Sequence, residues 1–186
     1  MKHTLKFFLS RLLIKLHLSK FFVINQKYYN LRFYPSILSR ELWINPHYLE
    51  IYWKYRTDFF WKYLLPGDVV VDVGSHIGTV TLESAAKVGN TGKIYSIEAH
   101  PKIFNFLNGN ISLNKFKNTQ TFNLALGNES KIVTISDLHT DPSNVIELQS
   151  IAIDEAPTDL KVSVLPFPEY HQEYDPSSSS VSLVAS

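Results

Sequence analysis

The feature that most constrains the fold is a hydrophobic segment that ends in an acid and a glycine-containing turn. Residues 69–78 read Val-Val-Val-Asp-Val-Gly-Ser-His-Ile-Gly. The apolar run predicts a buried strand over 69–73, and the turn leads into a predicted helix over about 77–88 that stops at Gly89. A strand followed at once by a helix is the first half of a βαβ unit. The segment therefore predicts an α/β fold with a parallel sheet.

The following residues continue the same alternation of strand and helix. The pattern predicts a strand over 93–98, a helix over about 102–114 and a strand over 120–124. Two shorter strands are expected near 131–136 and 146–153. Together with the first strand this makes about five, so we expect a Rossmann-like sheet that is incomplete.

Composition divides the chain into three parts. Residues 1–66 are rich in aromatic side chains, and the first 40 residues contain eight Lys or Arg and no Asp or Glu. We expect this part to be a basic, helical lead-in whose aromatic residues form core. Residues 67–165 carry the strand and helix pattern and are predicted to form the Rossmann-like domain. Residues 166–186 are rich in proline and serine and are predicted to be a disordered tail.

Composition also excludes several kinds of site. The chain has no cysteine, which excludes disulfides, thiolate metal sites and thiol nucleophiles. Aromatic residues between 25 and 66 could stack on bases, but acids interrupt the positive charge there, so we expect no nucleic-acid partner. Asp137, His139 and Asp141 could suggest a metal, but they lack a fourth ligand. No metal site is predicted.

Residues 1–24 are apolar and contain five cations. Their apolar runs are too short to span a bilayer, and Arg11, Lys15 and Lys20 interrupt the unbroken stretch that a secretory signal needs. Two interpretations remain for this segment. It is a helix that docks on a membrane surface or a partner, or a helix that packs on the domain. The predicted location is cytoplasmic, with membrane association through residues 1–24 as the alternative.

The glycine turn has the residues of a small-ligand site. Gly74 can adopt a positive φ and has no Cβ, so backbone can pass close to a ligand. Gly78 is expected to let the next helix pack tightly on the strand. The N-terminus of that helix presents free N–H groups to a carboxylate or phosphate. Asp72 offers an acceptor to an ammonium or hydroxyl group, which suits an amino-acid moiety better than a pyrophosphate.

The next strand also ends in an acid, Glu98. In doubly wound sheets an acid at this place accepts hydrogen bonds from ribose hydroxyls. The dinucleotide pattern G-x-G-x-x-G is not met after Gly74, which makes NAD binding the weaker interpretation. The two strand ends together predict a site for a nucleoside cofactor.

Four segments resemble successive blocks of the FkbM-type methyltransferases. They read VVVDVGSHIGTVTL, IYSIEAHP, NFLNGNISLNKFKN and TFNLALGNES and lie within residues 68–135. The resemblance implies a class I methyltransferase sheet with S-adenosylmethionine as its cofactor. It also implies an enzyme that O-methylates a hydroxyl of a sugar or secondary metabolite, so that the partner is a small-molecule or glycan acceptor.

The same resemblance implies roles for residues of the site. Asp72, Gly74 and Gly78 would surround the methionine moiety, Glu98 would bind the ribose, and Ala125 would lie near the adenine.

Three further positions belong to the resembling blocks. Ser75 and His76 complete the predicted cofactor-binding turn, where His76 is expected to act through its backbone rather than as a base. His100 is expected to mark the start of the next helix at the rim of the site.

Two asparagines on the second predicted helix, Asn110 and Asn114, belong to the same pattern. They are expected to form structural hydrogen bonds to a neighbouring loop.

The second half of the FkbM pattern is not intact. Its strand with two acids near the transferred methyl group has its nearest counterpart at residues 159–166, where Ser163 and Leu165 stand in place of the acids. No catalytic residue is therefore predicted. An active methyltransferase remains the favoured interpretation. The alternatives are a non-catalytic remnant that binds the cofactor or a partner, and a membrane-surface adaptor.

Overall fold

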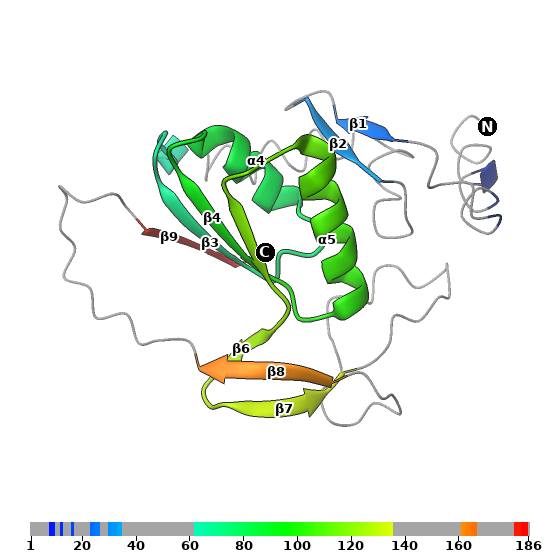
Figure 1. Cartoon of the computed structure of the whole chain (residues 1–186), viewed down its shortest axis with the longest axis vertical. Helices are drawn as coiled ribbons and strands as arrows, with labels where there is room; N and C mark the ends of the chain where they lie inside the picture. Colours follow the sequence, from blue (N-terminus) through cyan, green and yellow to red (C-terminus); the bar gives the residue numbers. More distant parts are fainter. Residues whose placement is uncertain are drawn as a thin grey trace.

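The computed structural model describes part of the chain, namely residues 8–9, 12, 16, 23–26, 30–34, 62–135, 161–166 and 181–185. For residues 24–26 and 181–185 it describes the backbone only. The complete elements of these residues form two sheets, two helices and a short hairpin (Figure 1), and residues 8–9, 12 and 62–63 are also helical.

The main sheet consists of four parallel strands. They are β3 (Val69–Val73), β4 (Lys93–Ile97), β5 (Thr119–Phe122) and β9 (Val181–Ala185). Their order is β5-β4-β3-β9, and each pairing is parallel. Counted along the chain, this is the order 3-2-1-4 that begins the doubly wound Rossmann sheet. The predicted α/β class with a parallel sheet is confirmed.

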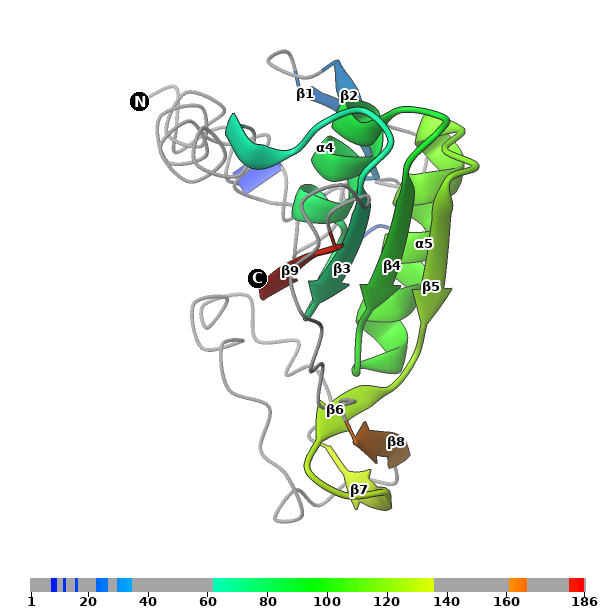
Figure 2. The ribbon, with the colours of Figure 1, turned by 90° about the vertical axis from the view of Figure 1, so that its left-hand side faces the viewer.

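Helix α4 (Thr79–Val88) connects β3 to β4, and α5 (Pro101–Asn114) connects β4 to β5. Both helices lie on one side of the main sheet (Figure 2). A buried cluster between the sheet and α4 includes Val70, Ile94 and Val88. A second cluster joins Leu82 of α4 to Leu107 of α5. The helices therefore pack on the sheet and on each other.

The elements expected from periodicity occur close to their predicted places. Strand β3 has the expected bounds, and β4 and α5 deviate by one residue at an end. Helix α4 begins two residues after the expected residue 77, because Gly78 adopts a left-handed φ of 91° and ends the turn. The strand predicted over 120–124 ends at Phe122. The strand expected over 146–153 lies outside the described residues.

A second, smaller sheet contains β6 (Ala125–Gly127), β7 (Lys131–Thr134) and β8 (Lys161–Pro166) in the order β6-β8-β7. Buried and exposed residues alternate along most of β8, and Val162 and Val164 form an apolar cluster with Val133 of β7 and with Ile135, which follows β7. The arrowheads of β3, β4 and β5 point towards this sheet in Figure 2, so it lies beyond their carboxyl ends. Within the stretch 159–166, residues 161–166 thus supply a strand of the small sheet rather than of the main one.

The prediction of a disordered tail over 166–186 is wrong at two places. Pro166 ends β8, and residues 181–185 form β9, which pairs with β3 along its whole length. Residues 181–185 read Val-Ser-Leu-Val-Ala, a sequence that favours a strand. The compositional argument averaged these residues with the proline and serine that precede them and so missed the strand.

The prediction of a helical lead-in is also wrong in part. Strands β1 (Ile24–Gln26) and β2 (Leu31–Phe33) form an antiparallel pair, and Asn30 before β2 adopts a left-handed φ of 55°. Leu31 and Phe33 are buried and Arg32 is partly exposed, which is the period-two pattern of a strand. Among the described residues, no helix has the length and hydropathy needed to cross a bilayer.

Helix α4 buries a carboxyl group. Glu83 is 5% exposed, and its Oε2 atom has no hydrogen-bond partner among the residues that the structure describes. Burial raises the pKa of Glu83 from 4.5 to about 8, because the charged form loses its hydration. Between these two values the unfolded chain has released the proton and the folded chain retains it. Stability that is complete below pH 4.5 is therefore lost as the pH rises towards about 8.

The variant Glu83→Gln tests this effect. We expect it to be more stable than the wild type near pH 8 and to lose less stability between pH 4.5 and 8, because the amide does not ionise. Thermal unfolding across this pH range measures the effect. The control is Glu129→Gln, since the Glu129 side chain is 64% exposed and its change should leave the profile unaltered. Parallel profiles for wild type and Glu83→Gln would contradict the prediction.

Candidate functional site

The candidate site lies at the carboxyl ends of β3 and β4, which are neighbours in the sheet. The loop 74–78 follows β3, and residues 98–100 follow β4. Strand β3 has β4 on one side and β9 on the other, so the strand order reverses beside it. In open α/β sheets, ligands bind at such a switch point, outside the carboxyl ends of the strands.

The turn after β3 is held by its own backbone and by β4. The N–H groups of Gly74 and Ser75 both donate to the carbonyl oxygen of Ile97, at 2.9 and 3.0 Å. The Ser75 hydroxyl donates to the carbonyl oxygen of Asp72 at 2.8 Å. Gly74 has a φ of 78°, as expected, and His76 also has a positive φ, of 51°. Ser75 therefore stabilises the turn through both its N–H and its hydroxyl group.

Gly78 permits a close contact, but the contact is with a residue of α5 instead of the expected one with the strand. A Cβ at this position would lie 2.8 Å from Cδ1 of Leu107, which belongs to α5. The close neighbour of Gly78 is thus the second helix rather than the strand. Helix α4 begins after Gly78 without a side-chain cap and without an acid in its first turn. Its first N–H groups and its positive dipole end suit the carboxylate of a ligand.

Asp72 is fully buried. Its Oδ2 atom accepts a hydrogen bond from the Thr81 hydroxyl of α4, and that hydroxyl lies 3.0 Å from the Ser96 hydroxyl of β4. Asp72 and Ser96 are also partners in the register of β3 and β4. The carboxylate thus ties α4 to both strands from inside the helix–sheet interface. Its contact with a ligand ammonium group stays a prediction.

Glu98 connects the two loops of the site. Its Oε2 atom accepts a hydrogen bond from the His76 N–H at 2.9 Å, and its Oε1 atom accepts one from the His100 N–H at 2.8 Å. Burial raises the pKa of Glu98, and the two backbone hydrogen bonds oppose that rise. An ionised carboxylate has about four acceptor positions, so two remain for other donors such as hydroxyls.

His76 and His100 differ in what they contribute. His76 donates through its backbone, as expected, and burial lowers the pKa of its ring, which favours the neutral imidazole. His100 precedes α5, and its Nδ1 accepts a hydrogen bond from the Lys102 N–H at 3.2 Å. The prediction that His100 starts the helix is confirmed. It is not a rim residue, because it is 1% exposed.

The expected structural role of Asn110 and Asn114 is confirmed. Asn110 is buried, donates to the Ile77 carbonyl oxygen at 2.8 Å and accepts from the Tyr34 N–H at 2.8 Å. Asn114 exchanges hydrogen bonds with the backbone of Arg32, at 2.8 and 2.7 Å. The two amides dock β2 and Tyr34 on α5. Through Ile77, Asn110 also connects this amino-terminal part to the glycine turn.

Three residues of the site's frame were not predicted from the sequence. Thr81 and Ser96 form the hydroxyl pair beside Asp72. Asn123 follows β5, and its amide donates to the carbonyl oxygens of Glu98 and Ala99, at 2.8 and 2.9 Å. A serine within the apolar strand 93–98 was the signal for such a buried polar contact.

Ala125 begins β6 and is partly buried. It packs, together with Ala99, against the apolar cluster of the small sheet. Since Ala99 directly follows Glu98, Ala125 lies on the side of the site that faces this sheet. Its predicted place near an adenine is not tested by these contacts.

The described residues contain no group of three His, Asp or Glu that could hold a metal ion. Asp137, His139 and Asp141 lie outside these residues.

Comparisons with known proteins identify a class. A family model described as the TRM5/TYW2 methyltransferase domain matches residues 59–137. A SAM-dependent methyltransferase from Aquifex aeolicus is 24% identical over 46% of this chain and 44% of its own, with a TM-score of 0.39. P. horikoshii TYW2, in complex with MeSAdo, is 34% identical over 36% and 25%, with a TM-score of 0.32. The chain spans less than half the length of these proteins.

The family match and the strand order agree. The chain carries an incomplete Rossmann-like fold of the class I methyltransferases, a class that uses S-adenosylmethionine. Both the predicted fold class and the predicted cofactor are confirmed at this level. The matching family model is not that of the FkbM-type enzymes, so membership of that family stays a prediction.

The hydroxyl bridge beside Asp72 predicts a measurable stabilisation. We expect Thr81→Val to lower the free energy of unfolding by about 1 to 3 kcal/mol, because a buried carboxylate loses a donor. Urea unfolding measures the change. Thr121→Val is the matched control, because the Thr121 hydroxyl bonds to a partly buried asparagine instead of a carboxylate, and its loss should cost less. Equal losses in the two variants would argue against a special role for the bridge.

The contact between Gly78 and Leu107 predicts a second effect. Gly78→Ala should destabilise the chain through both its φ of 91° and its overlap with Leu107, by roughly 2 to 5 kcal/mol in total. Gly67→Ala is the control. It has a similar φ of 95°, but its added Cβ would meet only Thr91, at an ordinary 3.7 Å. If both variants lose the same stability in urea unfolding, the helix contact is unimportant.

Proposed function

We propose that this chain acts as an S-adenosylmethionine-dependent methyltransferase whose cofactor binds across the carboxyl ends of β3 and β4. The observation that carries the proposal is the Glu98 carboxylate, which joins the loops after both strands while keeping acceptor positions for hydroxyl groups. Residues 67–165 would form the cofactor-binding domain, with β9 added to its sheet.

Each part of the site suits one part of the cofactor. The uncapped start of α4, after Gly78, would accept the methionine carboxylate. Glu98 would accept hydrogen bonds from the ribose hydroxyls, and Ala125 would lie beside the adenine. Asp72 would act chiefly by holding α4 and the turn in place, since its carboxylate faces the helix–sheet interface.

The bound cofactor supplies an electrophilic methyl group on a sulfonium. The chain's task is to hold that methyl group in line with an acceptor oxygen and to provide a base for the acceptor's proton. The positions that correspond to acids in the FkbM pattern, Ser163 and Leu165, are exposed in β8 of the small sheet. We therefore propose no residue of β8 as the base.

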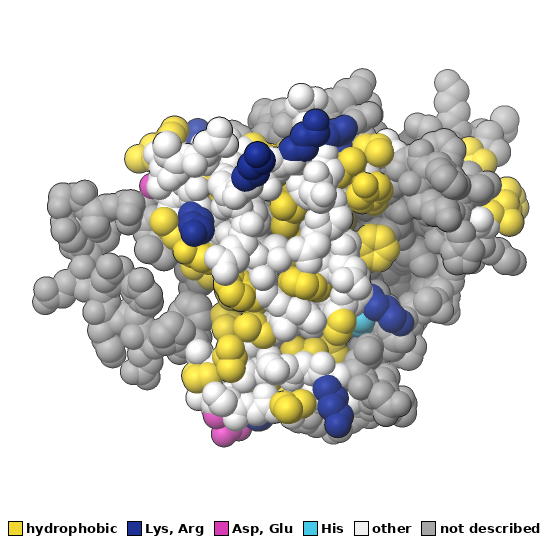
Figure 3. Space-filling view, in the orientation of Figure 1, with side chains coloured by type: hydrophobic (Ala, Val, Ile, Leu, Met, Phe, Trp, Pro, Cys, Tyr) yellow, Lys and Arg dark blue, Asp and Glu magenta, His cyan; other side chains and the backbone are white. Residues whose placement is uncertain are grey.

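The acceptor that the FkbM resemblance favours is a hydroxyl of a sugar or secondary metabolite. A second candidate is a nucleic acid, because the TRM5/TYW2 proteins are tRNA methyltransferases. One observation supports it: in the described part of the chain none of the nine Lys and Arg is buried, whereas four of the five Asp and Glu are. Among the coloured side chains of Figure 3, Lys and Arg spread over the face and acids occur only near its margin.

Calorimetric titration with S-adenosylmethionine and S-adenosylhomocysteine tests the cofactor site. We expect saturable binding by the wild type and a loss of affinity of about tenfold or more in Glu98→Gln, because the amide cannot accept from both loops and its NH₂ group opposes one backbone donor. Glu129→Gln, an exposed carboxylate, should bind like the wild type.

Thermal unfolding of each variant separates loss of the site from loss of the fold. A folded Glu98→Gln variant with unchanged affinity would overturn the proposed site. If the wild type binds the cofactor, transfer of a labelled methyl group to a glycan or to RNA would identify the acceptor. Cofactor binding without transfer to either would favour the non-catalytic remnant.

A further inference from the structure

The amino-terminal segment exposes a group of large apolar side chains. Phe8, Leu9 and Leu12 are helical, and the Leu16 N–H donates to the Leu12 carbonyl oxygen at 2.9 Å, the i to i−4 bond of an α-helix. The exposed fractions of these four residues are 68, 50, 41 and 54%, respectively. None of these four side chains is buried.

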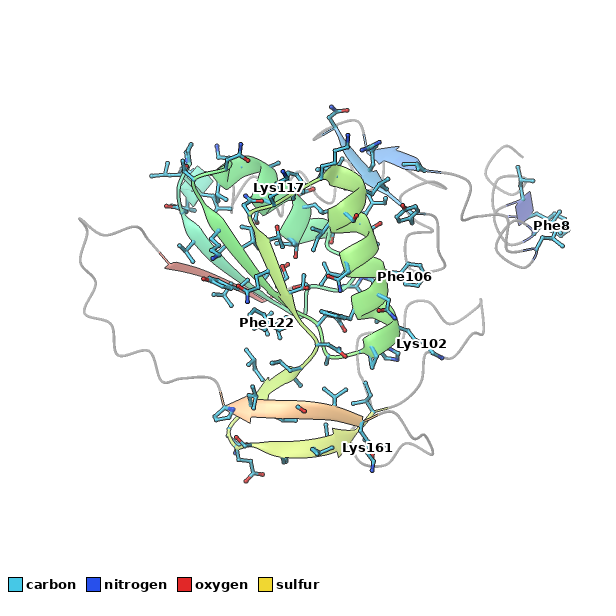
Figure 4. The ribbon with its side chains drawn as sticks, viewed as in Figure 1. Phe8, Lys102, Phe106, Lys117, Phe122 and Lys161 are labelled. Atoms are coloured by element: carbon cyan, nitrogen blue, oxygen red, sulfur yellow. The ribbon has the colours of Figure 1, made fainter. Side chains whose placement is uncertain are left out.

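The four residues form one stripe. On a helix that turns by about 100° per residue, they fall within an arc of about 100°. That width is typical of the apolar face of a helix that is covered by something. Phe8 points away from the sheet and its helices in Figure 4. We name Phe8, Leu9, Leu12 and Leu16 the apolar stripe.

The charge around the apolar stripe has a single sign. Residues 1–24 contain five Lys or Arg and no Asp or Glu. In the sequence, Lys2 and Lys6 precede the stripe, Arg11 and Lys15 lie between its members, and Lys20 follows it. Long cationic side chains in such positions can reach lipid headgroups while the apolar residues between them enter the acyl boundary.

We propose that the apolar stripe docks this protein on the surface of an anionic bilayer. The phosphate backbone of a nucleic acid would attract the cations but leave four large apolar side chains in water. A second copy of the segment would bring the same positive charge and be repelled. An anionic bilayer satisfies both features, since it offers negative headgroups above an apolar interior. The proposal is independent of the cofactor site.

Co-sedimentation of the full chain with lipid vesicles tests the proposal. Two kinds of vesicle are compared. The neutral vesicles contain phosphatidylcholine alone, and the anionic vesicles contain equal parts of phosphatidylcholine and phosphatidylglycerol. We expect binding to the anionic vesicles that weakens as salt is added, and much weaker binding to the neutral ones. The double variant Leu12→Glu/Leu16→Glu should bind the anionic vesicles about tenfold or more weakly, because it removes apolar contact and adds negative charge.

The matched control is Leu65→Glu/Ile132→Glu, which adds the same charge at two apolar residues that are 61 and 70% exposed outside the stripe. It should bind like the wild type. The proposal is overturned if both double variants, folded by thermal unfolding, bind equally well. It is also overturned if the wild type binds neither kind of vesicle, or if Leu12→Glu/Leu16→Glu abolishes only a concentration-dependent self-association, in which case the stripe pairs copies of the chain.

Discussion

The candidate site depends on a single buried carboxylate. Glu98 accepts one backbone N–H from the loop after β3 and one from the loop after β4. These loops start on neighbouring parallel strands, where Gly74 and Ser75 already donate to the Ile97 carbonyl oxygen, and the carboxylate extends this connection to His76 and His100. The cost of burying this acid is offset in part by the two donors it receives. Loss of the bridge would remove one hydrogen bond from each of the two loops.

Polar contacts behind the site support this bridge. Thr81 joins α4 to the Asp72 carboxylate and the Ser96 hydroxyl, and Asn110 joins α5 to the glycine turn through the Ile77 carbonyl. Asn110 also receives the Tyr34 N–H, so the segment after β2 is part of the same network. The amino-terminal part of the chain therefore helps to position the turn. For the segment that carries the apolar stripe we propose a separate role, docking on a membrane surface.

Sequence reasoning succeeded where one local pattern was enough. Apolar periodicity predicted β3, β4 and α5 almost to the residue, and Gly74 was correctly expected to have a positive φ. It failed where the partner lay far away in the chain. The tail strand β9 was missed because its partner β3 precedes it by more than a hundred residues, and composition alone gave no sign of that pairing.

By itself, the sequence determined the alternation of strands and helices, the glycine turn after an acid, and an amino-terminal end that carries cations but no acids. Tertiary structure alone decided that Glu98 bridges two loops, that Asp72 faces a helix instead of the open end of the sheet, and that residues 161–166 belong to a second sheet. The physical reason is that periodicity and turn chemistry act between near neighbours in the chain. The partner of a buried polar group, or of a strand edge, is chosen by packing among segments that only the folded chain brings together.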